Sequence, residues 1–249
     1  NLLRRRPLLF SSFVKLFQDL TEETREALLS LEDFRATIKS IGCQSQEFFE
    51  VVETIPTACD PLTQIIFDTL NPFSGSPSFL PVIDYYINSV RVVFEQRGSK
   101  DTTLLVPIIP TMSKAEIVER LPSFMDCPSQ YIATAIDLII QRPALKVASD
   151  CGSFSPKDLL IDLHSGRFPD LQVIRGTEEC LKSPVFEKKD LATVFQKIVE
   201  YRKPCQSFFH LAGCIVAKEP SLRPTIVGSV SQVASQNFAS VFSDGFLEL

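Results

Sequence analysis

The stretch from Thr111 to Arg142 constrains the fold of this chain most, because it carries the start and stop signals of two consecutive helices. Ser113 is placed to cap the first helix, and Glu116, its third residue, is placed to complete a capping box. Pro122 and Pro128 are expected to interrupt this helix and to set up the next one. The stretch therefore predicts a helical hairpin.

The second helix of this hairpin has apolar residues at the period of an amphipathic helix that packs by one face. The stripe consists of Ile132, Ala135, Ile136, Ile139 and Ile140. We expect the helix to end at Arg142, because Pro143 follows and the residue before a proline disfavours the helical conformation. The pattern indicates a helix pair with one apolar face, and it carries no chemistry by itself.

The rest of the chain repeats this organisation. It contains 17 prolines and only 9 glycines, which favours helices punctuated by prolines over hairpin strands. Ser155, Pro156 and Asp158 supply a second helix cap, a first-turn proline and an acidic third residue. Short apolar stripes with short connections predict an all-α fold in which antiparallel helix pairs stack as a HEAT-like α-solenoid.

We expect residues 1–249 to form a single helical-repeat domain, with residues 71–77 as the one candidate break. Leu104–Ile109 is a short apolar run that we expect to be helical, because no partner strand is in view. The helix expected over residues 170–181 contains Gly176, a candidate helix breaker.

Two pairs of adjacent aromatic residues, Phe48–Phe49 and Phe208–Phe209, do not fit a single buried stripe. Neighbouring positions on a helix point about 100° apart, so both rings cannot centre on one face. We therefore expect one member of each pair to lie at a helix–helix or partner interface.

Composition disfavours several classes of function. The net charge of -5 disfavours a nucleic-acid-binding surface, and no apolar run approaches the ~18–20 residues of a membrane span. We expect neither a direct nucleic-acid partner nor a membrane. Seven cysteines without a CxxC pair predict reduced, mostly buried thiols in an intracellular protein. The chain begins with Asn1 rather than methionine, and we expect it to be part of a longer protein.

The sequence has no Gly-rich phosphate loop, zinc-binding HExxH or nucleophile elbow. The best candidate metal ligands are Cys205, His210 and Cys214. Cys205 and Cys214 point to opposite sides of a helix, which disfavours a shared ion. Asp158, Asp162 and His164 leave acid–base hydrolysis open as an alternative, although a cap, a solvated carboxylate and a helix-terminal histidine explain them better. We expect no catalysis, no cofactor and no metal.

Three segments resemble, in the same order, the C-terminal region of the symplekin family, the scaffold of the eukaryotic pre-mRNA 3′-end processing machinery. They are LLVPIIPTMSKAEIVERLPSFM (Leu104–Met125), SPKDLLIDLHSG (Ser155–Gly166) and DLATVFQKIVEYRKPCQSFFHLAGCIVAKEPSLRPTIVGSV (Asp190–Val230). The first is similar in its apolar run, its lysine–acidic–aliphatic helix start and its Leu-Pro. The second is similar in its acidic–Leu-Leu helix with Leu-His. The similar region covers about Val93 to Val233.

This resemblance implies a HEAT-like scaffold without catalysis of its own, located in the nucleus as part of the cleavage and polyadenylation factor. It implies protein partners, chiefly the C-terminal domains of the cleavage endonuclease subunit and of its inactive homologous partner. An RNA-binding helical-repeat module is the alternative, and it would need a basic face. The residues expected to contact partners are Lys114, Arg120, Phe124, Asp162 and His164.

Overall fold

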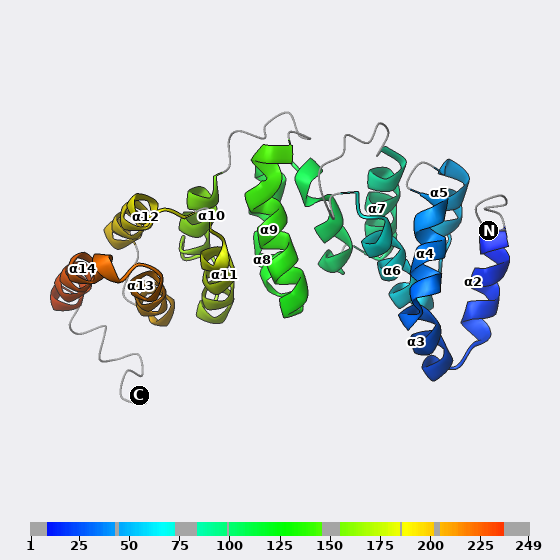
Figure 1. Cartoon of the computed structure of the whole chain (residues 1–249), viewed down its shortest axis with the longest axis horizontal. Helices are drawn as coiled ribbons and strands as arrows, with labels where there is room; N and C mark the ends of the chain where they lie inside the picture. The colour runs from blue at the N-terminus through cyan, green and yellow to red at the C-terminus, as the bar shows by residue number, and fades with distance from the viewer. Residues whose placement is uncertain are drawn as a thin grey trace. The chain divides into compact units, whose positions relative to one another are not determined.

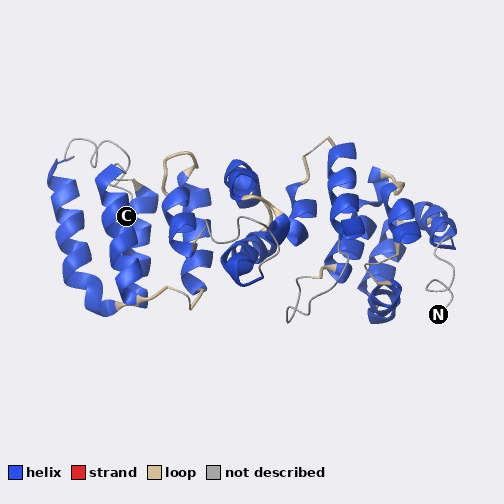
Figure 2. Ribbon diagram, turned by 90° about the horizontal axis from the view of Figure 1, so that it is seen from above, coloured by secondary structure: helices blue, strands red, loops and turns tan. Residues whose placement is uncertain are grey.

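The computed structural model describes residues 9–42, 45–72, 84–98, 100–145, 155–184, 186–201 and 205–236. Every helix or strand assigned in these ranges is an α-helix or a 3₁₀ helix and none is a strand, which confirms the all-α prediction (Figure 2). Contacts between Cα atoms divide the chain into two compact units, Asn1–Pro110 and Thr111–Leu249. The candidate break at residues 71–77 falls within the first unit, and residues 73–77 lie outside the described ranges.

In the first unit, α5 packs on both α2 and α7, while α4 packs on α6. The described helices of this unit are α2 (Leu9–Asp19), α3 (Glu22–Ser30), α4 (Glu32–Ile41), α5 (Gln46–Glu53), η1 (Thr57–Cys59), α6 (Asp60–Leu70), α7 (Asp84–Gln96) and η2 (Thr102–Thr111). The apolar run Leu104–Ile109 is helical as predicted, and it forms the middle of the 3₁₀ helix η2.

Aromatic rings form the centre of the first unit. Phe48 of α5 meets Phe10 of α2 with 4.9 Å between ring centroids, and Phe49 meets Tyr86 of α7 edge-on at 5.9 Å. Both phenylalanines are buried, so Phe48–Phe49 lies wholly inside the fold. A helix between two neighbours buries two faces, which makes room for adjacent rings. Tyr86 also donates a hydrogen bond to the carbonyl of Phe67.

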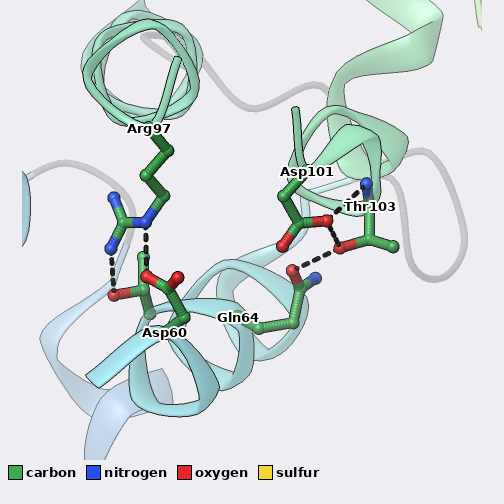
Figure 3. A network of polar contacts seen from close by, with 6 residues as sticks. Asp60, Gln64, Arg97, Asp101 and Thr103 are labelled. Atoms are coloured by element: carbon green, nitrogen blue, oxygen red, sulfur yellow. Dashed lines mark hydrogen bonds and ion pairs between the residues drawn. The ribbon is translucent and has the colours of Figure 1, made fainter. Parts of the chain in front are cut away.

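A polar network joins α6 to α7 and to η2 (Figure 3). The Arg97 guanidinium, whose side chain is 5% exposed, pairs with the Asp60 carboxylate and donates to Thr63 Oγ1 at 3.2 Å. Asp101 accepts hydrogen bonds from the backbone N–H and the hydroxyl of Thr103 at 3.1 and 2.5 Å. The same Thr103 hydroxyl lies 3.1 Å from the amide oxygen of Gln64 in α6. The start of η2 is therefore held against α6.

In the second unit, α8 pairs with α9, α10 with α11 and α13 with α14, and the helices stack in two series (Figure 1). Helix α11 packs on α9 and α13, and helix α12 packs on α10 and α14. The helices are α8 (Lys114–Met125), α9 (Ser129–Leu145), α10 (Pro156–Leu163), α11 (Asp170–Lys182), α12 (Lys188–Tyr201), α13 (Gln206–Lys218), η4 (Pro220–Leu222) and α14 (Arg223–Gln236). This arrangement is the stacked, HEAT-like pairing that the sequence predicts.

Both predicted helix starts of the second unit are present. The Ser113 hydroxyl accepts a hydrogen bond from the backbone N–H of Glu116 at 3.1 Å, and Met112 and Ile117 on either side of this cap are fully buried. Ser155 and Asp158 form a complete capping box at the start of α10. These signals act over three or four residues, and local sequence therefore suffices to predict them.

Two predicted helix ends are wrong. Helix α8 continues through Pro122 to Met125, and α9 continues past Arg142 and Pro143 to Leu145. An interior proline costs roughly 3 kcal/mol in a helix, but tertiary packing outweighs it here. Phe124 and Met125 are fully buried. Arg142 is also fully buried and donates a hydrogen bond to the carbonyl of Met112 at 2.6 Å.

Gly176 does not break its helix, which runs from Asp170 to Lys182. Instead it marks a close helix crossing. A Cβ atom at this position would lie 3.0 Å from Leu163 Cδ1 and 3.0 Å from Met125 Sδ. The missing side chain lets α11 approach the buried ends of α8 and α10.

Candidate partner-binding surface

Helices α8, α10 and α12 bring together charged residues that are far apart in the sequence. Lys114 begins α8, and its charge acts on two carboxylates of α10, Asp158 and Asp162. Lys197 of α12 acts on Asp158 as well. We call these residues, together with Lys157 and Arg167, the charged surface of the second unit. All of them are exposed or partly exposed.

Asp158 is held by its own helix cap. Its Oδ2 accepts hydrogen bonds from the Ser155 backbone N–H at 3.0 Å and from the Ser155 hydroxyl at 2.8 Å. Burial alone would raise the pKa of this carboxyl. The two hydrogen bonds and the charges of Lys114 and Lys197 outweigh burial, so the Asp158 pKa lies below its ordinary value. Asp158 is thus a stably ionised structural carboxylate.

Asp162, one turn further along α10, has the opposite shift. Burial raises its pKa, and the charges of Arg167 and Lys114 do not fully compensate. The Arg167 guanidinium lies 3.8 Å from Asp162 Oδ1, a long contact between side chains that are 45% and 30% exposed. Asp162 is therefore a partly exposed carboxylate whose ionised form is destabilised by partial burial, and a further cation beside it would stabilise that ionised form.

Lys157 and Asp190 link α10 to α12 across the same surface. The Lys157 Nζ lies 2.5 Å from Asp190 Oδ1, and the hydrogen bond from Lys157 lowers the pKa of Asp190. No sequence signal marks this pair, because its members are on different helices and only the stacking of the helices brings them together.

The five predicted contact residues divide into two groups. Lys114, Arg120 and Asp162 are partly exposed, and Arg120 lies 3.9 Å from Glu116 one turn before it. Phe124 and His164 are fully buried. The His164 Nε2 lies 3.0 Å from the Thr177 hydroxyl of α11. In this fold, Phe124 and His164 position the helices that carry the charged surface and present no area of their own to a partner.

The candidates for chemistry are not assembled into a site. His164 is directed to Thr177, whereas Asp158 is engaged in its cap and Asp162 faces Arg167. Cys205 contacts Ser207 at 3.2 Å, while Cys214 contacts His210 at 3.3 Å. Within the described ranges, no cluster of three or more His, Cys, Asp or Glu residues has the geometry to hold a metal ion.

The cysteines that the structure describes form no disulfide with one another. Cys59, Cys127 and Cys180 are buried, and Cys205 and Cys214 are half-buried. Burial raises the pKa of Cys59, Cys180 and Cys214 above the ordinary thiol value, which leaves these thiols protonated and weakly nucleophilic. Cys43 and Cys151 lie outside the described residues.

The comparisons with known proteins give one match. No curated protein and no solved structure matches the chain. None of the helices in the described ranges has both the length and the apolar character that crossing a membrane requires. A family model described as the C-terminal region of symplekin, a tight junction protein, matches residues 101–236. These residues make up more than half of the chain and run from just before η2 to the end of α14. The chain therefore belongs to the symplekin family, and the matched residues correspond to the C-terminal region of that family.

Proposed function

We propose that this chain is a non-catalytic protein-interaction scaffold of the pre-mRNA 3′-end cleavage and polyadenylation complex in the nucleus. The observation that carries the proposal is the family match over residues 101–236, which covers the stacked helices of the second unit. We further propose that its partners are the C-terminal domains of the cleavage endonuclease subunit and of its inactive homologous partner.

The charged surface is the part of the second unit that we assign to these partners. It carries both signs of charge in close alternation, which suits the orientation of a partner more than bulk attraction. Asp162 is its most useful member for recognition, because its carboxylate is incompletely compensated by Arg167 and Lys114. A lysine or arginine of the partner that approached Asp162 would gain a charge-assisted hydrogen bond.

The chemistry of the described residues supports a scaffold rather than an enzyme. A hydrolase built on Asp158, Asp162 and His164 would need the imidazole within hydrogen-bond reach of a carboxylate and of the substrate. The imidazole is instead fully buried beside Thr177. A carboxylate held in a helix cap and a buried histidine are stabilising elements of α10.

The proposal is tested by size-exclusion chromatography with light scattering, using the chain alone and mixed with the two C-terminal domains at about 10 µM. We expect a complex whose mass is the sum of its components. Separate peaks at this concentration, which corresponds to binding weaker than about −7 kcal/mol, would contradict the scaffold proposal. Binding of single-stranded RNA that weakens steeply with salt would favour the RNA-binding alternative.

The assignment of the surface is tested by Asp162→Lys, with Glu200→Lys as its control. Glu200 is exposed on α12 of the same unit, and the two substitutions change the net charge equally. We expect Asp162→Lys to weaken the complex by about tenfold, or about 1.4 kcal/mol, and Glu200→Lys to leave it unchanged. Equal affinities for both variants would show that the partners bind elsewhere on the chain.

A further inference from the structure

Helices α13 and α14 form an apolar groove that is open to solvent. It holds about 280 Å³, which is less than the roughly 300–1,000 Å³ of a typical small-molecule pocket. Phe209 and Val216 of α13 lie along one wall, and Val227 and Val230 of α14 lie along the other. Val227 is 52% exposed. The groove therefore suits a few apolar side chains of a peptide better than a small ligand.

Helix α13 divides its apolar residues between the core and the groove. Phe208, Leu211 and Ile215 are fully buried. Phe209 and Val216, which directly follow the first and the last of them, are half-buried and line the groove. Neighbouring positions on a helix point about 100° apart. The groove therefore lies on a different side of α13 from its core contacts.

Gly213 also lines the groove, and the fold of the chain does not require a glycine there. Its φ is outside the left-handed region, and a Cβ at this exposed position would meet no atom within 4 Å. Glycine is the poorest helix former apart from proline, so α13 itself would be more stable with another residue. A glycine lets another chain approach the backbone closely, and Gly213 therefore leaves room for an occupant of the groove.

The charge beside the groove is positive, although the chain as a whole carries a net charge of -5. Helices α13 and α14 contain no aspartate or glutamate. Lys218 of α13 donates hydrogen bonds to the carbonyls of Leu181 and Ser183. Arg223, the first residue of α14, is exposed and lines the groove. The groove is therefore complementary to a partner that carries a carboxylate next to its apolar residues.

We propose, independently of the function proposed above, that this groove binds an acidic amphipathic helix of a partner protein. Apolar side chains at i, i+3, i+4 and i+7 of that helix pack between α13 and α14, and a flanking carboxylate pairs with the Arg223 guanidinium. The groove follows α14 from Arg223 to Val230, about two helical turns or roughly 10 Å, which matches this spacing. Both walls are helices whose interior backbone groups are already hydrogen-bonded. They offer no free edge to an extended peptide, so a helix is the occupant.

The test begins with a selection of peptides on the whole chain. A display library of helical peptides, each about 16 residues or roughly four turns long, varies the apolar residues at i, i+3, i+4 and i+7. Half of its members carry glutamate at the flanking positions and half carry lysine. We expect glutamate to predominate among the selected peptides, with a Kd of about 1–100 µM by fluorescence anisotropy. The absence of binders, or a predominance of lysine, would overturn the proposal.

Two leucine substitutions then locate the binding site. Gly213→Leu fills the groove, whereas Gly228→Leu adds the same side chain to α14 at an exposed position that does not line the groove. A Cβ at either glycine would meet no atom within 4 Å, so circular dichroism should show that both variants retain their helices. We expect Gly213→Leu to weaken binding of the selected peptide at least tenfold and Gly228→Leu to leave it unchanged. Equal affinities of the two variants would place the peptide elsewhere and refute the proposal.

Charge reversal tests the contact with Arg223. Arg223→Glu should weaken binding of the selected glutamate peptide about tenfold and strengthen binding of its lysine counterpart by a similar factor. Arg175→Glu is the control, because Arg175 is exposed on α11 and does not line the groove, while the change in net charge is the same. Equal effects of the two reversals would show that net charge alone attracts the peptide, and the assigned contact would be wrong.

Discussion

Replacing Gly176 by alanine should destabilise the protein, whereas the same replacement at Gly213 should stabilise it. Both glycines are inside helices, α11 and α13, where alanine is favoured over glycine by roughly 1 kcal/mol. The difference lies in their surroundings. A Cβ at Gly213 meets nothing within 4 Å, while a Cβ at Gly176 meets Leu163 and Met125 at 3.0 Å.

The magnitude follows from the burial of these neighbours. Leu163 and Met125 are both fully buried, so they cannot move aside into solvent, and overpacking of such a core costs about 1–3 kcal/mol. Subtracting the gain in helix propensity leaves a net loss of about 1 kcal/mol for Gly176→Ala. Gly213→Ala should gain about 0.5–1 kcal/mol. Thermal unfolding followed by circular dichroism should separate the two variants by about 4–8 °C.

A second substitution identifies the contact responsible. Leu163→Val removes the Cδ atoms that the new methyl group would meet, so Gly176→Ala should cost less in the Leu163→Val background. The reasoning is refuted if Gly176→Ala stabilises the chain as much as Gly213→Ala does. It is also refuted if Gly176→Ala lowers the free energy of unfolding equally in both backgrounds, because the contact between the new methyl group and Leu163 would then have no effect on stability.

Three further outcomes follow from polar contacts of the second unit. Arg142→Ala should lower the free energy of unfolding by about 3 kcal/mol in urea titrations, because it leaves a cavity and removes the charged donor to the Met112 carbonyl. Ser155→Ala should cost about 1 kcal/mol at neutral pH. That loss should shrink in acid titrations below about pH 4, because the lowered Asp158 pKa gives stability that is present above the ordinary aspartate pKa and is lost on protonation. Asp162→Asn should stabilise the chain at neutral pH and match the wild type near pH 3, because the raised Asp162 pKa means that the charged form costs stability.

Local signals in the sequence predict the helix starts well and the helix ends poorly. Ser113 and Ser155 act on backbone groups three residues away, so no knowledge of the tertiary fold is needed. Pro122 and Pro143 oppose the helix locally, but the burial of Phe124 and Arg142 overrides them. Such burial depends on which helix lies opposite, which a single sequence does not state.

The charged surface of the second unit is also predicted from the sequence only where local spacing decides the position of a residue. The carboxylate pair of α10 is visible in the sequence as a spacing of four residues, and the structure places Asp162 on the surface as expected. His164 follows at the end of the same helix and is also expected from the sequence to contact partners, but it is fully buried, and its Nε2 lies 3.0 Å from the Thr177 hydroxyl of α11. The expectation for adjacent phenylalanines is confirmed for Phe48–Phe49, since Phe48 packs against Phe10 of α2 and Phe49 packs against Tyr86 of α7, so that both rings lie at helix–helix interfaces. In the second pair, Phe208 packs against Phe195 of α12 and Phe209 is half-buried.

The position of η2 affects how the protein can be dissected into fragments. The family match begins at residue 101, but η2 packs within the first unit, where Thr103 contacts Gln64. A fragment that starts at Asp101 would contain Leu104–Ile109 without the first unit. Because these side chains are almost fully buried in the whole chain, the fragment would expose apolar surface, and we expect it to self-associate. A fragment that starts at Thr111 would keep the Ser113 cap and the Met112 carbonyl that accepts a hydrogen bond from Arg142. Its first residue is that of the second compact unit and not that of the family match.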